Sequence, residues 1–378
     1  MAKERKQTVK KFKQDFVGNH PLRRFGILVV LAFELAGPTA TSAFGRARVV
    51  AYYPGWSSKA YPCTRIDYSQ VTDIAHAFVW PLTNGTLNVP PYYLYPELVD
   101  MAHAHGVRMI VTVGGGSKSI YFPAMARDPA ARAKFVRELT NFCVTNKYDG
   151  VDYDWESPTN AAERADFTSL IQETRGSLDA AKPNLTLSAA IRRTAKYGQW
   201  LDVDQLKKYL DWFGVMTYNF HTASARLSGH ASPLYASPAD PDGPTYSVDA
   251  SVKYYRERGV PQEKLFMGFL FHGYQYACTN LYAPSTMGSD GIYSNVVKNL
   301  SNGWTRVWDD TCRVPYLVNP DHTQLITYDD RQSTQEKCDY AAREHLSGTI
   351  IWALGLDSYP GSTNELLTIV GQSFLHRH

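Results

Sequence analysis

Cysteines are few in this sequence, and they lack the spacing of metal ligands. The chain of 378 residues has five, and an odd number leaves at least one thiol unpaired. A chain of this size does not need disulfides to be stable, and no two of the five have the close spacing of a structural zinc site. We therefore expect neither a metal nor a cofactor. The cysteines are Cys63, Cys143, Cys278, Cys312 and Cys338.

Beyond its first 43 residues the chain also lacks a clear excess of either charge. Residues 1–43 contain eight Lys or Arg and three Asp or Glu, and the whole chain has a formal net charge of +3, so the remainder carries −2. Such a nearly neutral body lacks the basic stripe of a nucleic-acid-binding domain. No apolar run after residue 43 approaches the ~20 residues that span a bilayer. We expect a monomer that binds no nucleic acid and does not insert stably into a membrane.

The first 43 residues have the three parts of a secretory signal. A basic stretch ends at Arg24, an apolar run covers 25–36, and small residues lead to Ala43. A membrane anchor is the alternative, but the run is short for a span and contains Glu34. We predict that residues 1–43 are an export signal that is cleaved, and that the protein is secreted to the extracellular space or the periplasm.

From residue 46 onward, short runs typical of strands alternate with stretches of helical character. This alternation favours parallel strands joined by right-handed crossovers, and eight such units predict a (β/α)8 TIM barrel. A doubly wound open sheet is the alternative. The expected strands are 48–54, 72–79, 108–115, 150–156, 184–191, 212–220, 264–271 and 348–355.

One connection is much longer than the others. About 76 residues separate the seventh strand from the eighth, whereas a parallel crossover needs only a dozen or more. The stretch contains one helix-like and several strand-like segments. We therefore predict a small α+β insertion at residues 273–346, with the barrel formed by residues 46–272 and 347–378.

The segment "YDGVDYDWESP" at 148–158 places carboxylates on alternate positions of an expected strand. Side chains of a strand repeat on one face every second residue, so Asp152, Asp154 and Glu156 share a face that we expect to point into the barrel. Glu156 is nearest the C-terminal mouth, where barrel enzymes have their active sites. Crowded buried carboxylates retain at least one proton. A solvated edge strand and a site for a divalent cation are the alternatives.

This segment resembles the D-x-x-D-x-D-x-E signature of the family 18 glycoside hydrolases, the chitinases and their relatives. The resemblance covers about residues 48–370, and further segments carry it. They are "TVGG" (112–115), "MTYN" (216–219), "GHASPLY" (229–235), Trp352 and "YDDRQS" (328–333), the last resembling part of the insertion domain found in one chitinase subgroup.

The resemblance implies a retaining reaction in which the substrate assists, an exception to the scheme with two catalytic carboxylates. Glu156 would protonate the glycosidic oxygen while the substrate's 2-acetamido carbonyl attacks the anomeric carbon and forms an oxazolinium ion. Asp154 would orient the acetamido group, Asp152 would share a proton with Asp154, and Tyr218 would hydrogen-bond the acetamido group.

The resemblance also implies that chitin or chitooligosaccharides bind along aromatic residues. The residues expected to bind substrate are Trp352, Trp56, Tyr52, Phe78, Trp80, Met216, Asn219, Tyr328 and Asp329. Those expected to support the site are Thr112, Gly114, Gly115 and Asp149.

Two positions depart from the family pattern, which affects the expected pH optimum and sugar preference. Asn219 stands where Asp is more usual, and Ser157 stands where many chitinases have Tyr. The main expectation is a secreted chitinase. The alternatives are an endo-β-N-acetylglucosaminidase that acts on N-glycans and an inactive chitin-binding lectin, which would typically lack Glu156.

Overall fold

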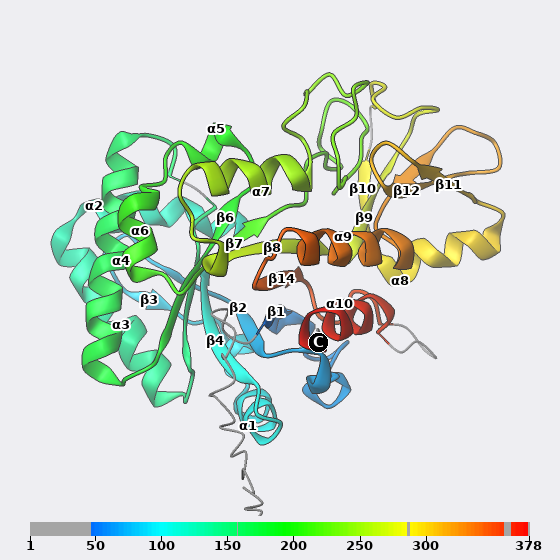
Figure 1. The fold of residues 1–378 in the computed structure, drawn as a ribbon. Helices are drawn as coiled ribbons and strands as arrows, with labels where there is room; N and C mark the ends of the chain where they lie inside the picture. Colours follow the sequence, from blue (N-terminus) through cyan, green and yellow to red (C-terminus); the bar gives the residue numbers. More distant parts are fainter. Residues whose placement is uncertain (1–46, 157, 286–287, 359–363, 377–378) are drawn as a thin grey trace, which may run out of the picture. The chain divides into compact units, whose positions relative to one another are not determined.

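Eight parallel strands form a closed barrel in the computed structural model, which describes residues 47–156, 158–285, 288–358 and 364–376. The expected export signal and Ser157 lie outside these residues. Closure follows from β1, which pairs in parallel with both β2 and β14, and the (β/α)8 barrel is thus confirmed (Figure 1). In order, the strands are β1 (Arg48–Pro54), β2 (Asp73–Pro81), β4 (Arg108–Gly114), β5 (Gly150–Asp154), β6 (Thr186–Arg192), β7 (Trp212–Met216), β8 (Leu265–Leu270) and β14 (Gly348–Trp352).

Helices surround this barrel, and their ends follow local sequence signals. For example, α3 begins after Asp128, whose carboxylate accepts hydrogen bonds from two backbone N–H groups of the first turn, and Pro129 occupies the first helical position. None of the helices in the described residues is long and apolar enough to cross a membrane. The helices are α1 (Pro96–Ala104), α2 (Phe122–Arg127), α3 (Pro129–Thr145), α4 (Ala161–Ala181), α5 (Ala195–Gly198), α6 (Val203–Tyr209), α7 (Val248–Glu257), α8 (Tyr293–Val296), α9 (Arg331–Arg343) and α10 (Glu365–Leu375).

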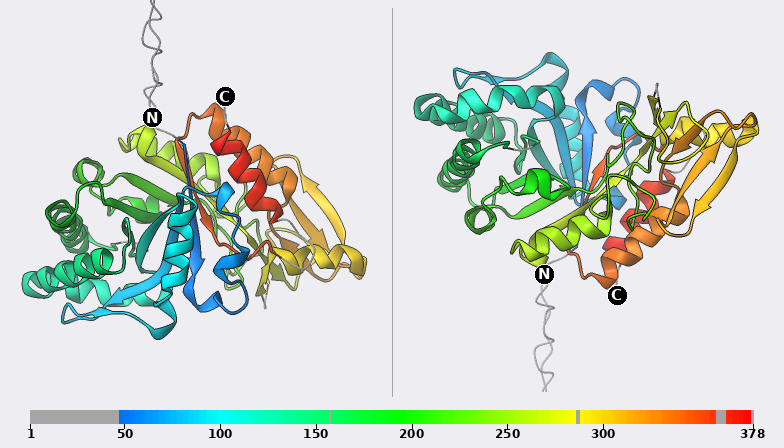
Figure 2. Two further views of the ribbon diagram at one scale, coloured as in Figure 1. Left: turned by 90° about the horizontal axis from the view of Figure 1, so that it is seen from below. Right: turned by 90° about the horizontal axis from the view of Figure 1, so that it is seen from above.

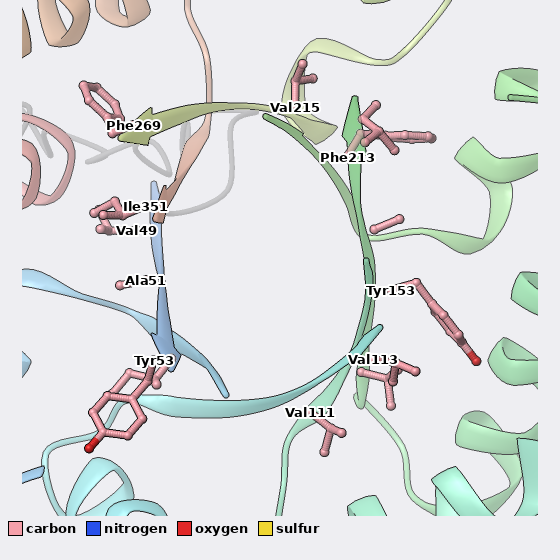
Figure 3. Close-up of a cluster of buried hydrophobic side chains, with 14 of the residues drawn as sticks. Val49, Ala51, Tyr53, Val111, Val113, Tyr153, Phe213, Val215, Phe269 and Ile351 are labelled. Carbon is pink, nitrogen blue, oxygen red and sulfur yellow. The ribbon is translucent and has the colours of Figure 1, made fainter. Parts of the chain in front are cut away.

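The main core lies between the strands and the surrounding helices. Alternate side chains of β1, Val49, Ala51 and Tyr53, point outward from the ring of strands (Figure 3) and belong to this core. The intervening Val50 and Tyr52 belong to a separate cluster inside the barrel. The period of two residues therefore divides every strand into an outer and an inner face.

A second, antiparallel sheet is formed by the chain between β8 and β14. Its strand order is β10-β9-β13-β12-β11, and α9, which follows it, lies beside α10 (Figure 2). The short strands expected from the sequence are thus present here, while membership of the chitinase subgroup stays a prediction. The strands are β9 (His272–Tyr276), β10 (Gly288–Ile292), β11 (Thr305–Asp309), β12 (Val314–Val318) and β13 (Leu325–Thr327); a further short strand, β3 (Leu87–Asn88), pairs with β2.

Candidate active site

A pocket of about 440 Å³ opens at the C-terminal ends of the barrel strands, where barrel enzymes place their catalytic groups. It contains most of the residues that the sequence suggested. The small sheet contributes the wall formed by His272, Tyr274 and Asp290. The lining residues are Tyr52, Trp56, Phe78, Trp80, Tyr92, Gly114, Gly115, Gly116, Ser117, Lys118, Asp154, Glu156, Ala190, Met216, Tyr218, Asn219, His272, Tyr274, Asp290 and Trp352.

The two aspartates of β5 point into the barrel. Asp152 is 3% exposed, and its carboxylate accepts hydrogen bonds from the Tyr52 hydroxyl of β1 at 2.8 Å and the Ser188 hydroxyl of β6 at 2.7 Å. Asp154 is 6% exposed and lines the pocket. The outer face of the same strand carries Tyr153, whose hydroxyl lies 2.8 Å from that of Thr174 on α4. The alternation expected for this strand is therefore correct.

These aspartates hold protons more strongly than ordinary carboxyl groups. Burial raises the pKa of Asp152, although its hydrogen bonds to Ser188 and Tyr52 oppose the shift. Burial raises the pKa of Asp154 well above its usual range, and the charges of Glu156 and Asp152 raise it further. Because two adjacent buried carboxylates cannot both ionise readily, the pair favours a state in which one proton is retained.

Glu156 lies beyond the end of its strand, which differs from the expectation that the strand continues to this residue. β5 ends at Asp154, and Glu156 has a φ of 51°, a left-handed conformation that is uncommon outside glycine. This left-handed backbone conformation, and not strand alternation, thus directs its side chain into the pocket. Glu156 is also more exposed than Asp154, so its carboxyl group is accessible to a bound substrate.

Two glycines after β4 allow the neighbouring loop to approach β5 closely. A Cβ at Gly114 would lie 2.4 Å from the carbonyl oxygen of Asp154, and a Cβ at Gly115 would lie 2.6 Å from the Phe78 ring. Both glycines have positive φ angles, 110° and 77°. The backbone geometry beside the pocket therefore requires glycine at both glycine positions of the "TVGG" segment.

Aromatic rings line one side of the pocket. The rings of Trp352 and Phe78 lie 5.8 Å apart with an interplanar angle of 15°, and Trp56 lies 6.0 Å from Phe78. Trp56 is 52% exposed. Tyr218 also lines the pocket, and burial raises its pKa, so that its hydroxyl keeps its proton. Such rings can stack against the apolar faces of sugars while the hydroxyl donates a hydrogen bond.

Two residues expected to bind substrate do not line the pocket. Tyr328 and Asp329 are buried, and both carboxylate oxygens of Asp329 bind the ammonium of Lys337, at 2.5 and 2.6 Å. Because a buried lysine requires a counter-ion, Asp329 has a structural role as the counter-ion of Lys337. The small sheet instead lines the pocket through residues of β9 and β10.

The residues of that wall form a hydrogen-bonded chain that the sequence analysis missed. The Tyr274 hydroxyl donates to the amide oxygen of Asn219 at 2.7 Å and lies 2.9 Å from Nε2 of His272. Burial lowers the pKa of His272 to about 4, which leaves its ring neutral near pH 7. The alternation of His272 and Tyr274 on one face of β9 was the available signal.

The supporting residues fall into two groups. Asp149 binds Nε2 of His103 at 2.7 Å and the backbone N–H of Met109, so it joins α1 and β4 at the opposite end of the barrel. Thr112 is buried beside Asp152 in the paired strand, but its hydroxyl has no hydrogen-bond partner among the described residues. The hydroxyl of Ser188, and not that of Thr112, donates a hydrogen bond to Asp152.

Two groups of described residues have side chains close enough to share a metal ion, and neither lines the pocket. They are His230, Asp309 and Cys312, and His221, Asp240 and Asp242. In each group the histidine Nε2 already lies within hydrogen-bond distance of an aspartate, at 3.0 and 2.8 Å respectively. Hydrogen bonding within the protein is thus sufficient to explain why these side chains lie close together.

A barrel whose pocket combines buried aspartates of raised pKa, an adjacent glutamate and aromatic rings is typical of the glycoside hydrolases, which use paired carboxyl groups at the scissile bond. Residues 48–357 match glycosyl hydrolases family 18, and the chain belongs to this family.

The chain is similar in sequence to proteins named as chitinases, and it shares its fold with a protein described as a pseudo-chitinase. Chitinase A1 of Niallia circulans is 28% identical over 90% of this chain, and a probable endochitinase of Caenorhabditis elegans is 32% identical over 67%. The chain spans only 60% and 44% of the lengths of these two proteins. The structure of human YKL-39, described as a pseudo-chitinase with retained chitooligosaccharide-binding properties, has a TM-score of 0.80 and 23% identity, covering 86% of this chain and 99% of YKL-39.

Proposed function

We propose that this protein is a secreted chitinase that hydrolyses the β-1,4 bonds between N-acetylglucosamine units with retention of configuration. The observation that carries the proposal is the position of Glu156, which lines the pocket together with Asp154 and Trp352. A glutamic acid at this place can protonate the oxygen of a bond whose sugar rests on the tryptophan. The substrate class comes from the family, since its named relatives are chitinases.

The first step of the proposed reaction breaks the glycosidic bond without a protein nucleophile. Glu156 transfers its proton to the bridging oxygen, and that oxygen leaves with the electron pair of its bond to the anomeric carbon. The acetamido carbonyl oxygen of the same sugar forms a new bond to this carbon and gives a cyclic oxazolinium ion. Asp154 accepts a hydrogen bond from the acetamido N–H and balances the positive charge, while Tyr218 donates to the acetamido group.

The second step opens the oxazolinium ion with water. Glu156, now a carboxylate, removes a proton from the water as the water oxygen bonds to the anomeric carbon. The bond between this carbon and the acetamido oxygen breaks, which restores the acid and the acetamide. Asp152 acts behind Asp154: it accepts hydrogen bonds from Tyr52 and Ser188 and shares the proton of the pair. Two inversions at the same carbon give net retention.

A chitin-binding lectin is the rival function, because YKL-39 combines the same fold with binding but is described as a pseudo-chitinase. The fold thus does not separate the two functions, and Glu156 does. Measuring the release of soluble sugars from chitin distinguishes them: a chitinase releases N-acetylglucosamine oligomers, and a lectin binds chitin without releasing any.

An endo-β-N-acetylglucosaminidase is the second rival. It would use the same acid on the core of an N-glycan. Digesting chitohexaose and a high-mannose glycopeptide, with the products assigned by mass spectrometry, decides between the substrates. We expect cleavage of chitohexaose alone; cleavage of the glycopeptide alone would reject the chitinase assignment.

We also propose that the protein is exported and acts as a monomer on chitin or its oligosaccharides. The charge and apolar pattern of residues 1–43 supports export. Determining the N-terminus of the protein recovered outside producing cells tests it, since a mature chain should begin near residue 44.

A further inference from the structure

One wall of the pocket carries a lysine stacked on a tryptophan. The Lys118 ammonium lies 4.6 Å from the centre of the Trp80 ring, a cation–π distance. Both residues line the pocket that contains Glu156, and among the described lining residues Lys118 is the only Lys or Arg. One face of the Trp80 ring is therefore covered by a positive charge, so Trp80 is not the simple stacking platform that the sequence suggested.

The loop that carries this lysine passes directly beside the catalytic acid. A Cβ built at Gly116 would lie 3.7 Å from Oε1 of Glu156. Two residues later, the backbone N–H of Lys118 donates to the carbonyl oxygen of Gly115 at 2.9 Å, which closes a turn. Several lysines in the described part of the chain form ion pairs with carboxylates, and Lys118 is not among them. The charge of Lys118 is thus available to a bound sugar.

We propose that Lys118 makes the subsite at Trp80 selective for N-acetylated over deacetylated sugars. This inference rests on the proposed chitinase function. An acetamido group is neutral, and its carbonyl oxygen can accept a hydrogen bond from the ammonium of Lys118. A glucosamine unit instead carries an ammonium in mildly acidic buffer, and the two positive charges repel each other.

The expected selectivity follows from Coulomb's law. Repulsion between two unit positive charges about 6 Å apart should weaken the binding of a glucosamine unit, relative to an N-acetylglucosamine unit, by roughly 3-fold in a water-like medium. At an effective dielectric constant of about 20 the factor is roughly 100-fold. The pocket wall is partly exposed, so the effect should lie between these values. Salt should weaken it, because exposed charges are screened.

The other charged groups of the pocket stay in place when Lys118 alone is replaced, so such a replacement isolates the effect of its charge at Trp80. Burial raises the pKa of Asp154, which weakens its negative charge before a substrate binds. Burial also lowers the pKa of His272 to about 4, so its ring is neutral. Asp290 remains, but it belongs to β10 in the small sheet and not to β2 or the loop after β4, which present Trp80 and Lys118.

Digestion of partially N-acetylated chitosan tests the inference. The products are end-labelled and sequenced by mass spectrometry, at low and at high salt. The reaction itself requires an acetyl group on the sugar at the new reducing end, so this position is not informative. Wild-type enzyme should also enrich acetylated units at another position of the products. Lys118→Gln should lower that enrichment several-fold and abolish its salt dependence, whereas Lys118→Arg, which keeps the charge, should preserve both.

The exposed Lys182 provides a control, because Lys182→Gln removes one charge outside the pocket lining. Unchanged enrichment in Lys118→Gln, or an equal loss in Lys182→Gln, would overturn the inference. Enrichment is a ratio within one digest, so it does not depend on the total activity of each variant. Failure of the proposed function looks different: wild-type enzyme would then release nothing from fully acetylated chitin oligomers.

Discussion

The buried carboxyl group of Asp357 should make the folded protein less stable as the pH rises from 4 to 7. Asp357 follows the last barrel strand, is 1% exposed, and accepts a hydrogen bond from the backbone N–H of Leu367 on α10 at 3.0 Å. Burial raises its pKa from 3.8 to about 6, although backbone hydrogen bonds oppose the shift. The folded state therefore binds a proton more tightly than the unfolded state does.

The sign and size of the effect follow from this shift. The stabilisation by the bound proton is fully present below about pH 4 and is lost as the pH rises through about 6. A shift of roughly two pKa units corresponds to about 3 kcal/mol at 1.36 kcal/mol per unit. Asp357→Asn resembles the neutral acid and keeps an oxygen for the Leu367 N–H, so its stability should lack this loss.

The assay is thermal or urea unfolding of both proteins from pH 4 to pH 7. We expect the two to be similar near pH 4, and the Asp357→Asn variant to become the more stable by up to about 3 kcal/mol near pH 7. The exposed Asp321, changed to Asn, is the matched control and should show no such trend. A stability difference between Asp357→Asn and wild type that stays constant with pH would refute the reasoning.

Four further predictions concern catalysis. Glu156→Gln should lower kcat by about 10²–10⁴-fold while oligosaccharide binding stays nearly intact, because the amide cannot donate the proton; near-normal turnover of a chitin oligomer would contradict the role of Glu156. Proton NMR in the first minutes should show the β-anomer as product, and fully deacetylated chitosan should not be cleaved, whereas an initial excess of α-anomer would exclude retention. Trp352→Ala should lower kcat/KM with the Tm unchanged within a few degrees; an unfolded variant whose folded fraction is fully active would make Trp352 merely a core residue.

Strand periodicity accounts for most of what could be predicted from the sequence. The eight strand-like runs are the eight barrel strands within a few residues at each end, because a buried strand needs a continuous apolar run and a helix needs a different period. The same periodicity correctly placed Asp152 and Asp154 on the inner face of β5. These are local properties, and a short stretch of chain contains all the information they require.

The main failure of the sequence-based predictions concerns how the small sheet packs against the barrel. Tyr328 and Asp329 were expected at the pocket, but Asp329 pairs with Lys337, and β9 supplies the wall through His272 and Tyr274. No local pattern indicates which strand of the small sheet faces the barrel mouth. That depends on how the sheet packs, which is a property of the whole fold.

The sequence by itself determined the barrel, the family resemblance and the presence of an acid at position 156. Only the tertiary structure decided what surrounds that acid. Barrel closure brings Tyr52 and Ser188, from β1 and β6, onto Asp152. A left-handed backbone conformation places Glu156 beside the loop that bears Lys118. Hydrogen bonds, burial and charge repulsion act over a few ångströms in space, whatever the separation along the chain, so the chemistry of the pocket emerges only when the strands are assembled.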